Sequence, residues 1–214
     1  MCSSDLRLRF PVDVSGALTR SVVFALLAAA IAVPIAVGAA RAIVRSRSRV
    51  ASIASTLPLG PSAVVVGFGV LVAYDTGFLD IRGRWWLVPV VHACVALPFA
   101  VRAVVPLVEA IPSDLGGAAA TLGASPLRRW FDIDRPLLRP ALATATAFSL
   151  AVSLGEFGAT SFLTRRGTTT VPIVVDALLG RAGAVPHATA FALSTVLLLA
   201  TTAIVTVVDR GVRT

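Results

Sequence analysis

Long apolar runs alternate with short polar segments along almost the whole chain. A helix needs about 20 mostly apolar residues to cross the hydrocarbon core of a bilayer, because no water is available there to hydrogen-bond the backbone. Runs of this kind predict five membrane-spanning helices, at residues 21–40, 61–78, 85–105, 141–163 and 187–208.

The run at 61–78 is the weakest of the five, because prolines and glycines interrupt it. A further apolar stretch, Val171–Leu179, is too short to cross and contains Asp176, so we expect a short interfacial or re-entrant helix. The transmembrane domain is thus expected at residues 21–210. Residues 1–20 lack the apolar stretch of a signal peptide and read as a truncated or foreign start.

The composition agrees with a membrane protein. Hydrophobic residues make up 57% of the chain and charged residues only 14%, with a mean hydropathy of +0.88. The net charge of +8 could suggest a nucleic-acid partner, but the arginines lie between the apolar runs instead of clustering on one surface. We therefore expect a lipid bilayer as the environment and no nucleic-acid binding.

The placement of arginine predicts the orientation, because cytoplasmic loops are enriched in basic residues. With five spans, eleven arginines fall on one side and eight on the other, and they are densest in residues 41–49 and 102–139. We expect these two segments and the carboxyl terminus to be cytoplasmic. The amino end would then lie outside, which suggests that at least one earlier helix is missing.

The loop at residues 107–140 is polar, yet its residues favour a folded element. Ser113 is expected to cap a short helix and Gly123 to end it. Four residues of this helix share one face through i, i+3, i+4 and i+7 spacing: Leu115, Ala118, Ala119 and Leu122.

A second helix is expected to begin at Ser125, with Pro126 in its first turn. Pro136 and Pro140 would then mark the return to the membrane. Two short helices at an angle would form a compact knob that a partner protein could bind closely. On architecture alone, an ordinary structured loop is the simpler interpretation.

The same loop resembles the cytoplasmic motif of permease subunits in binding-protein-dependent ABC importers. That motif runs Glu-Ala-Ala, three residues, Gly, nine residues, Ile-x-Leu-Pro. Both spacings are kept here, with Gly117 in place of the Glu and Arg135 in place of the Leu. In that family the motif forms the coupling helix, which docks in a cleft of the ATPase subunit. The resemblance implies this role for Gly117, Ala118, Ala119, Gly123, Ala124, Ser125, Pro126, Ile133 and Pro136.

The segment "SLGEFGATSFL", Ser153 to Leu163, is similar to iron(III)- and thiamine-type permeases, with molybdate and sulfate permeases as relatives. Similar stretches upstream and downstream extend the likeness over roughly residues 21–210. It implies an all-α bacterial inner-membrane protein with the MetI-like permease fold. It also implies three partners: an ATPase subunit, a second permease half or subunit, and an extracytoplasmic substrate-binding protein. Iron(III) or a thiamine-like molecule is the first substrate expectation, and a molybdate- or sulfate-like anion the next.

Glu156 is the one carboxylate inside a clearly spanning predicted helix, and it lies between Gly155 and Gly158. An ionisable group at membrane depth either lines a pathway or gate, or anchors helix packing, and both interpretations stay open. The small residues 155–159 are expected to form the interface with the second permease half.

Other chemistry is not indicated. His92 and His187 have no neighbouring ligands, so we expect no metal, and we expect no cofactor. The chain has no lysine for a Walker A loop, so ATP hydrolysis is assigned to a separate subunit. Two alternatives to an importer permease are a proton-coupled secondary transporter that uses Glu156 and a non-transporting membrane assembly protein.

Overall fold

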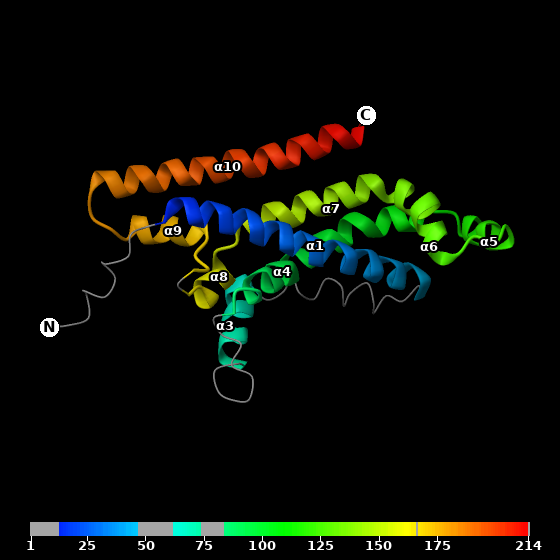
Figure 1. The fold of residues 1–214 in the computed structure, drawn as a ribbon, viewed down its shortest axis with the longest axis horizontal. Coiled ribbons are helices and arrows are strands. Elements are labelled where there is room, and N and C mark those ends of the chain that lie inside the picture. Colours follow the sequence, from blue (N-terminus) through cyan, green and yellow to red (C-terminus); the bar gives the residue numbers. More distant parts are fainter. Residues whose placement is uncertain (1–12, 47–61, 74–83, 166, 214) are drawn as a thin grey trace.

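The computed structural model describes residues 13–46, 62–73, 84–165 and 167–213, and every element within these residues is a helix (Figure 1). In chain order the elements are α1 (Val14–Ser46), α3 (Ala63–Ala73), α4 (Leu87–Ala110), α5 (Ser113–Thr121), α6 (Pro126–Arg129), the π-helical turn η3 (Trp130–Asp134), α7 (Arg135–Gly155), α8 (Gly158–Leu163), α9 (Val171–Leu179) and α10 (Ala184–Arg213).

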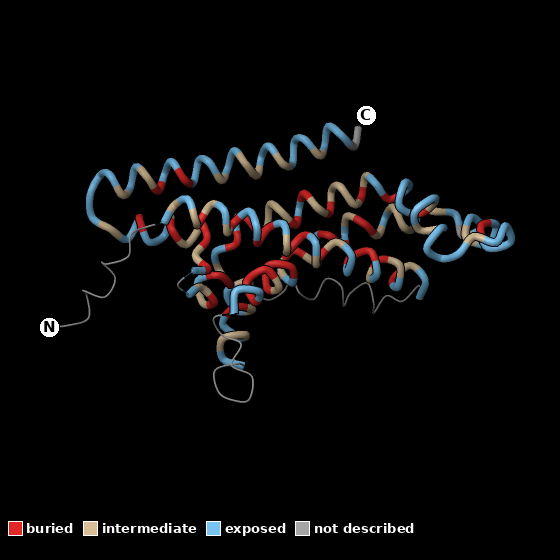
Figure 2. The backbone as a smooth tube through the Cα atoms, viewed as in Figure 1, coloured by how far each residue is buried: buried red, intermediate tan, exposed pale blue. Residues whose placement is uncertain are grey.

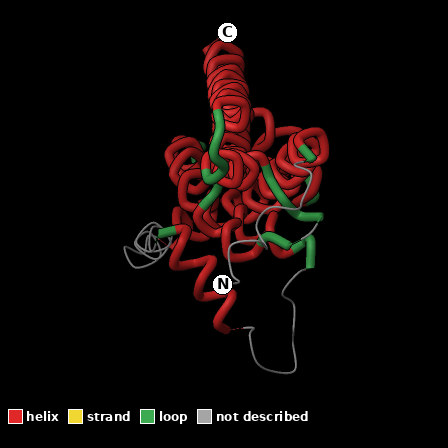
Figure 3. The backbone as a smooth tube through the Cα atoms, turned by 90° about the vertical axis from the view of Figure 1, so that its left-hand side faces the viewer, coloured by secondary structure: helices red, strands yellow, loops and turns green. Residues whose placement is uncertain are grey.

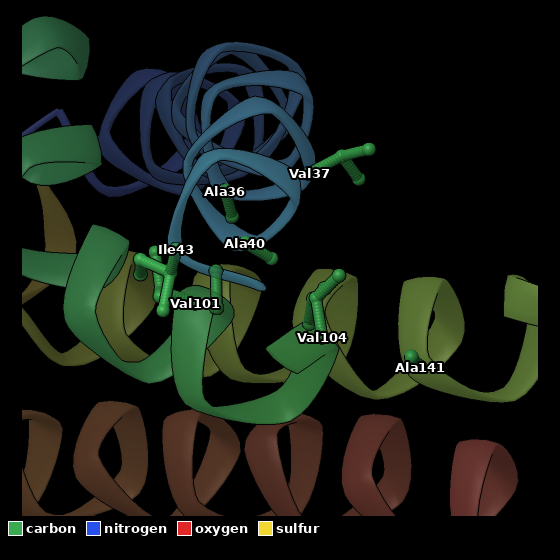
Figure 4. Packing of buried hydrophobic residues seen from close by; sticks show 9 residues of the cluster. Ala36, Val37, Ala40, Ile43, Val101, Val104 and Ala141 are labelled. Atoms are coloured by element: carbon green, nitrogen blue, oxygen red, sulfur yellow. The ribbon is translucent and has the colours of Figure 1, made fainter. Parts of the chain in front are cut away.

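Three long helices, α1, α4 and α7, pack side by side and form the core of the bundle (Figure 1). The buried face of α1 is a stripe of alanines spaced three or four residues apart, which lets the neighbouring helices approach closely. Figure 4 shows the end of this stripe, where Ala36, Ala40 and Ile43 lie against Val101 and Val104 of α4. Close van der Waals contact is the main force between helices in lipid, so this stripe determines how the bundle packs.

The last helix, α10, lies along the outside of the bundle against α7 and α9. Figure 2 shows that it stays exposed along most of its length, and Figure 3, which views the bundle end-on, places it at one edge. Its exposed side chains are large and apolar, among them Phe191, Leu198 and Leu199. A surface of this kind suits contact with lipid or with another membrane helix.

The short helix α9 is tied to the first helix by polar contacts. The hydroxyl of Ser21 accepts a hydrogen bond of 2.9 Å from the backbone N–H of Val171, and Arg20 Nε donates to the carbonyl oxygen of Thr169 at 3.0 Å. At the start of α1 itself, Asp13 caps the helix by accepting from the Gly16 N–H at 2.8 Å, and this bond lowers the pKa of Asp13. The bounds of α9 confirm the short helix predicted at Val171–Leu179.

The helices extend beyond most of the predicted spans. Hydropathy locates only the stretch that fits the hydrocarbon core, whereas helical hydrogen bonding continues into the polar ends, as in α1, α4 and α10. Four helices are long and apolar enough to cross a membrane among the described residues. The second predicted span appears as α3, which has 11 described residues, and the rest of that prediction falls at 61 and 74–78, outside the described residues.

The structure corrects both bounds of the fourth predicted span, 141–163. The chain is already helical from Pro126 through η3 into α7, and it then breaks after Gly155, so that α8 is a separate helix. Glycine weakens a helix interior, and Glu156 adopts an extended ψ of 111°. Hydropathy alone does not register this break.

The arginine-rich segments lie together at one end of the bundle. The end of α1 and the helices α5 and α6 lie there, and α10 runs toward the same end and stops beside α7 (Figure 1). The opposite end contains α8, α9 and the starts of α1 and α10. The arginines of these segments therefore lie toward one end of the bundle.

Candidate functional site

Helix α5 ends in a hydrogen-bonded stop centred on Gly123. The N–H of Gly123 donates to the carbonyl oxygen of Ala120 at 3.0 Å, and the N–H of Ala124 reaches back to Ala119 at 2.9 Å. Gly123 has a φ of +76°, the left-handed conformation that this pair of bonds requires. The geometry is a Schellman motif, and it confirms the predicted helix stop.

The beginning of α5 differs from the prediction. The helix starts at Ser113, and Pro112 takes the cap position without a side-chain hydrogen bond. Since proline fixes its own φ and Ser113 follows it directly, the first helical turn forms one residue earlier than expected. The surface of α5 is otherwise open: Gly117 and Ala118 are exposed, and a Cβ on Gly117 would meet no atom within 4 Å.

Ser125 and Pro126 start the next helix as predicted. The Ser125 hydroxyl accepts from the N–H of Arg128 at 3.3 Å, and Pro126 occupies the first turn, where its missing N–H has no cost. The helix does not end before the membrane, however, because α6, η3 and α7 are continuous. Pro136, the second residue of α7, and Pro140 both lie within this continuous helix, so neither marks the return to the membrane as predicted.

A buried carboxylate at the base of this loop was missed by sequence reasoning. Asp134, at the end of η3, accepts a hydrogen bond of 2.6 Å from Nη2 of Arg41 in α1. Nε of Arg129 lies 3.5 Å from the other carboxylate oxygen, and the Arg41 guanidinium lies over the Trp130 ring, 4.5 Å from its centre. The side chain of Asp134 is only 10% exposed. In the sequence motif it occupies the variable position between Ile133 and Arg135, so no signal singled it out.

Glu156 does not lie inside a spanning helix as predicted. It stands in the break between α7 and α8, and its Oε1 accepts a hydrogen bond of 2.9 Å from the N–H of Ala159. The carboxylate therefore satisfies a backbone donor at the start of α8 that would otherwise be unpaired. Its side chain is buried, which agrees with the packing-anchor interpretation.

The small residues around Glu156 pack mainly within the chain. A Cβ on Gly158 would lie 2.9 Å from the Val64 side chain, and a Cβ on Gly67 would lie 2.5 Å from Ala159 Cα. Gly158 and Ala159 thus allow α3 and α8 to touch, which corrects the expectation that they form the interface with a second permease half. Gly155 is different: it is exposed, and it lines an open cavity of about 340 Å³ beside α9 and α10.

His92 of α4 bridges the same helix break. Its Nδ1 lies 2.7 Å from the Ser153 hydroxyl, and its Nε2 lies 2.7 Å from the Thr160 hydroxyl. Thr160 already donates its one hydroxyl proton to the Glu156 carbonyl, so it must accept from Nε2–H, and Ser153 then donates to Nδ1. Since Ser153 precedes the break and Thr160 follows it, His92 holds both sides in place. In the sequence, His92 was evaluated only as a metal ligand, so this role was missed.

Comparison with known proteins agrees with these features. The chain matches the family of binding-protein-dependent transport system inner membrane components over residues 18–214. It is 37% identical over 125 residues to the 2-aminoethylphosphonate transport system permease protein PhnV of Salmonella typhimurium, an alignment that covers 58% of this chain and 47% of PhnV.

Two further relatives are a sulfate and a molybdenum transport system permease. The identity is 38% over 85 residues to CysT of Salmonella typhimurium, covering 40% of this chain and 31% of CysT. It is 36% over 142 residues to ModB of Haemophilus influenzae, covering 60% and 62%. The chain spans about half the length of PhnV, the relative matched most significantly among these.

The family match covers nearly the whole chain, and the described residues are all-helical with helices of membrane-spanning length. The chain is thus a multi-pass inner-membrane transport component with the MetI-like permease fold. It belongs to the binding-protein-dependent transport system inner membrane components, the permease family of ABC importers.

Proposed function

We propose that this chain forms one permease half of an ATP-driven importer and that α5 is the coupling helix that docks on a separate ATPase subunit. The observation that supports this most is the geometry of α5. It is a short helix with a hydrogen-bonded stop, it projects from one end of the bundle, and the small residues Gly117 and Ala118 face outward. A partner can approach the backbone closely at these two small residues, and the exposed Leu115 and Leu122 on either side of them offer apolar contact.

The end of the bundle that contains α5 is proposed to be cytoplasmic. Arginines gather there on α1, α6, η3–α7 and α10, and the positive-inside rule favours that side. The proposal puts the carboxyl terminus inside as well. The opposite end, with α8 and α9, would then face the extracytoplasmic binding protein, and a second permease half would complete the translocation path.

A small oxyanion is the proposed substrate class. The relatives described above are named for transport of 2-aminoethylphosphonate, sulfate and molybdenum, and each of these travels in water as an oxyanion or contains an anionic phosphonate group. The proposed outer end contains arginines on three separate segments, at Arg20, Arg84 and Arg165, which would favour an approaching anion. The iron(III)- and thiamine-type substrates are the alternative.

A proton-coupled mechanism through Glu156 has less support. Its carboxylate accepts a backbone hydrogen bond as a helix cap, and this use favours a fixed structural role over a group that gains and loses a proton. A non-transporting assembly protein would bind a partner through α5 without substrate-dependent ATP turnover, so the experiment below separates it from an importer.

The test is copurification followed by reconstitution in liposomes. The wild-type chain should retain an ATPase subunit on detergent extraction, and the binding protein loaded with phosphonate, sulfate or molybdate should stimulate ATP hydrolysis. Gly123→Leu should insert normally yet release the ATPase, because a left-handed residue with a bulky side chain both strains the stop and widens the docking face. Gly117→Glu, which restores the usual residue of the motif at an open position, should retain it.

Full ATPase retention and normal uptake in Gly123→Leu would remove α5 from the coupling role. Stimulation by iron(III)- or thiamine-loaded binding protein alone would replace the oxyanion proposal while leaving the importer intact. Uptake that uncouplers abolish without any ATPase partner would favour the secondary transporter instead.

A further inference from the structure

The charged cluster at the base of the coupling loop connects three separate parts of the chain. Asp134 belongs to η3, Arg129 to α6, and Arg41 to α1, which is 93 positions away from Asp134 in sequence. The carboxylate receives one short hydrogen bond and one longer ionic contact. Both arginines thus depend on a single buried anion.

Arg129 extends this cluster to α5. A Cβ on Gly116 would lie 2.6 Å from Nη1 of Arg129 and 2.9 Å from its Cζ, so the guanidinium rests directly on the α5 backbone at this glycine. A larger residue at Gly116 would push the guanidinium away. Gly116 therefore permits a contact that joins α5 to the Asp134 carboxylate through one side chain.

Arg41 extends the cluster in the other direction, into the core. Its guanidinium lies over the Trp130 ring, and Trp130 packs against the apolar cluster that α1, α4 and α7 build. The path from α5 to α1 is therefore continuous, through Arg129, Asp134 and Arg41. The step from α5 to Arg129 is a close steric contact, the step from Arg129 to Asp134 is ionic, and the step from Asp134 to Arg41 is a short hydrogen bond.

The π-helical turn explains how Asp134 comes to point at α1. A π turn inserts an extra residue into helical hydrogen bonding and rotates the side chains that follow it. The extra residue places Asp134 on the buried face, whereas Asp132, two positions earlier, is exposed. Turns of this type persist where a particular side-chain direction compensates for their poorer geometry.

We propose that Asp134 is a positioning residue that transmits displacement of α5 to α1, so that ATPase motion reaches the spanning helices through the Arg129–Asp134–Arg41 link. The inference rests on the proposed function. A buried carboxylate between two arginines suits this task, because moving either cation away removes part of the positive charge that compensates the buried anion. The link therefore resists stretching and moves as a unit.

The chain offers a matched control in the same turn. Asp132 forms an ion pair with Arg128 at 3.3 Å, with the same residue types, but the two side chains are 61% and 76% exposed. Asp134→Asn and Asp132→Asn remove the same charge from positions two residues apart in η3. Solvent screens the Asp132 pair, so its loss should have little effect.

The experiment measures uptake per ATP hydrolysed in liposomes that contain the complete transporter, with the oxyanion that stimulates wild type most. Asp134→Asn should retain the ATPase subunit and its basal hydrolysis, yet transport about five-fold less substrate per ATP. Asp132→Asn should match wild type in all three measurements. The double variant Asp134→Asn/Arg41→Gln should regain part of the thermal stability, because it removes one of the two cations that Asp134→Asn leaves without the carboxylate, while its transport ratio stays low.

Three results would overturn the inference: a wild-type transport ratio in Asp134→Asn, an equal loss in Asp132→Asn, or a ratio in the double variant that recovers together with stability. If Asp134→Asn does not assemble, the double variant is judged by the same ratio in its place. Failure of the wild-type chain to bind or stimulate an ATPase contradicts the proposed function. A functional wild type with unaffected variants contradicts only the role of Asp134.

Discussion

Adding one methyl group at Gly117, inside α5, or at Gly123, in the stop that ends it, should have opposite effects on the stability of this helix. Gly123 holds a φ of +76°, and an added Cβ there would touch nothing within 4 Å, so the cost of Gly123→Ala is conformational and not steric. An L-residue in the left-handed region costs about 1–2 kcal/mol. Gly117 lies in regular helix with equally open surroundings, and Gly117→Ala should stabilise α5 by about 0.5–1 kcal/mol.

The two variants should therefore differ by about 1.5–3 kcal/mol in the free energy of opening α5, which corresponds to a ratio of about 10 to 150 in the opening equilibrium. Hydrogen exchange of the α5 amides in the detergent-solubilised protein measures this equilibrium directly. The amides of wild type should exchange at rates between those of the two variants. Amides in the core of α4 serve as the internal reference and should not change.

Equal protection of α5 in the two variants would refute the reasoning, because it would mean that the left-handed stop does not limit the stability of this helix. Stronger protection in Gly123→Ala would contradict it further. The result does not depend on any partner, so it tests the folded loop separately from its proposed docking role.

Three further predictions concern the helix break and the orientation. Gly67→Ala should lower the free energy of unfolding in detergent by about 1–3 kcal/mol, because its Cβ would lie 2.5 Å from the α8 backbone. Gly69→Ala in the same helix should be neutral or slightly stabilising. Equal effects of the two variants on thermal unfolding would contradict the close α3–α8 contact. Glu156→Gln keeps a hydrogen-bond acceptor and should leave stability unchanged, whereas Glu156→Ala should cost about 1 kcal/mol; impaired uptake in a stable Glu156→Gln variant would return this residue to the pathway. With the native cysteines removed, Ala182→Cys should react with an impermeant thiol reagent in intact cells and Leu127→Cys should not, and the reverse pattern would invert the proposed topology.

Features governed by neighbours in sequence could be predicted from the sequence. The stop at Gly123, the cap at Ser125 and the bounds of Val171–Leu179 each depend on residues within one or two helical turns. Glycine, serine and proline act locally through φ, a side-chain acceptor and a missing N–H. Local physics was sufficient for these elements.

Features governed by distant neighbours could not be predicted. His92 meets Ser153 and Thr160 across 61 and 68 positions, and Arg41 meets Asp134 across 93. Hydropathy also treats residues 141–163 as one apolar run. It averages side-chain polarity across the break after Gly155 and contains no information on which backbone groups are hydrogen-bonded. The sequence therefore indicated that Glu156 mattered and left its role open, and the contact with the Ala159 N–H favours the structural role.

Under the proposed function, α7 connects the Asp134 cluster at one end of the bundle with the His92 cluster at the helix break. At one end of α7, Asp134 binds α1 through Arg41; at the other end, Ser153 binds α4 through His92, directly before the break. The 21 residues between Arg135 and Gly155 span about 30 Å as helix, and the buried residues along this length are mostly apolar. A continuous helix that is tied to α1 at one end and to α4 at the other moves together with these helices. Displacement at the coupling loop would thus reach the α7–α8 break undiminished, and the chain can change direction there because Glu156 is already extended.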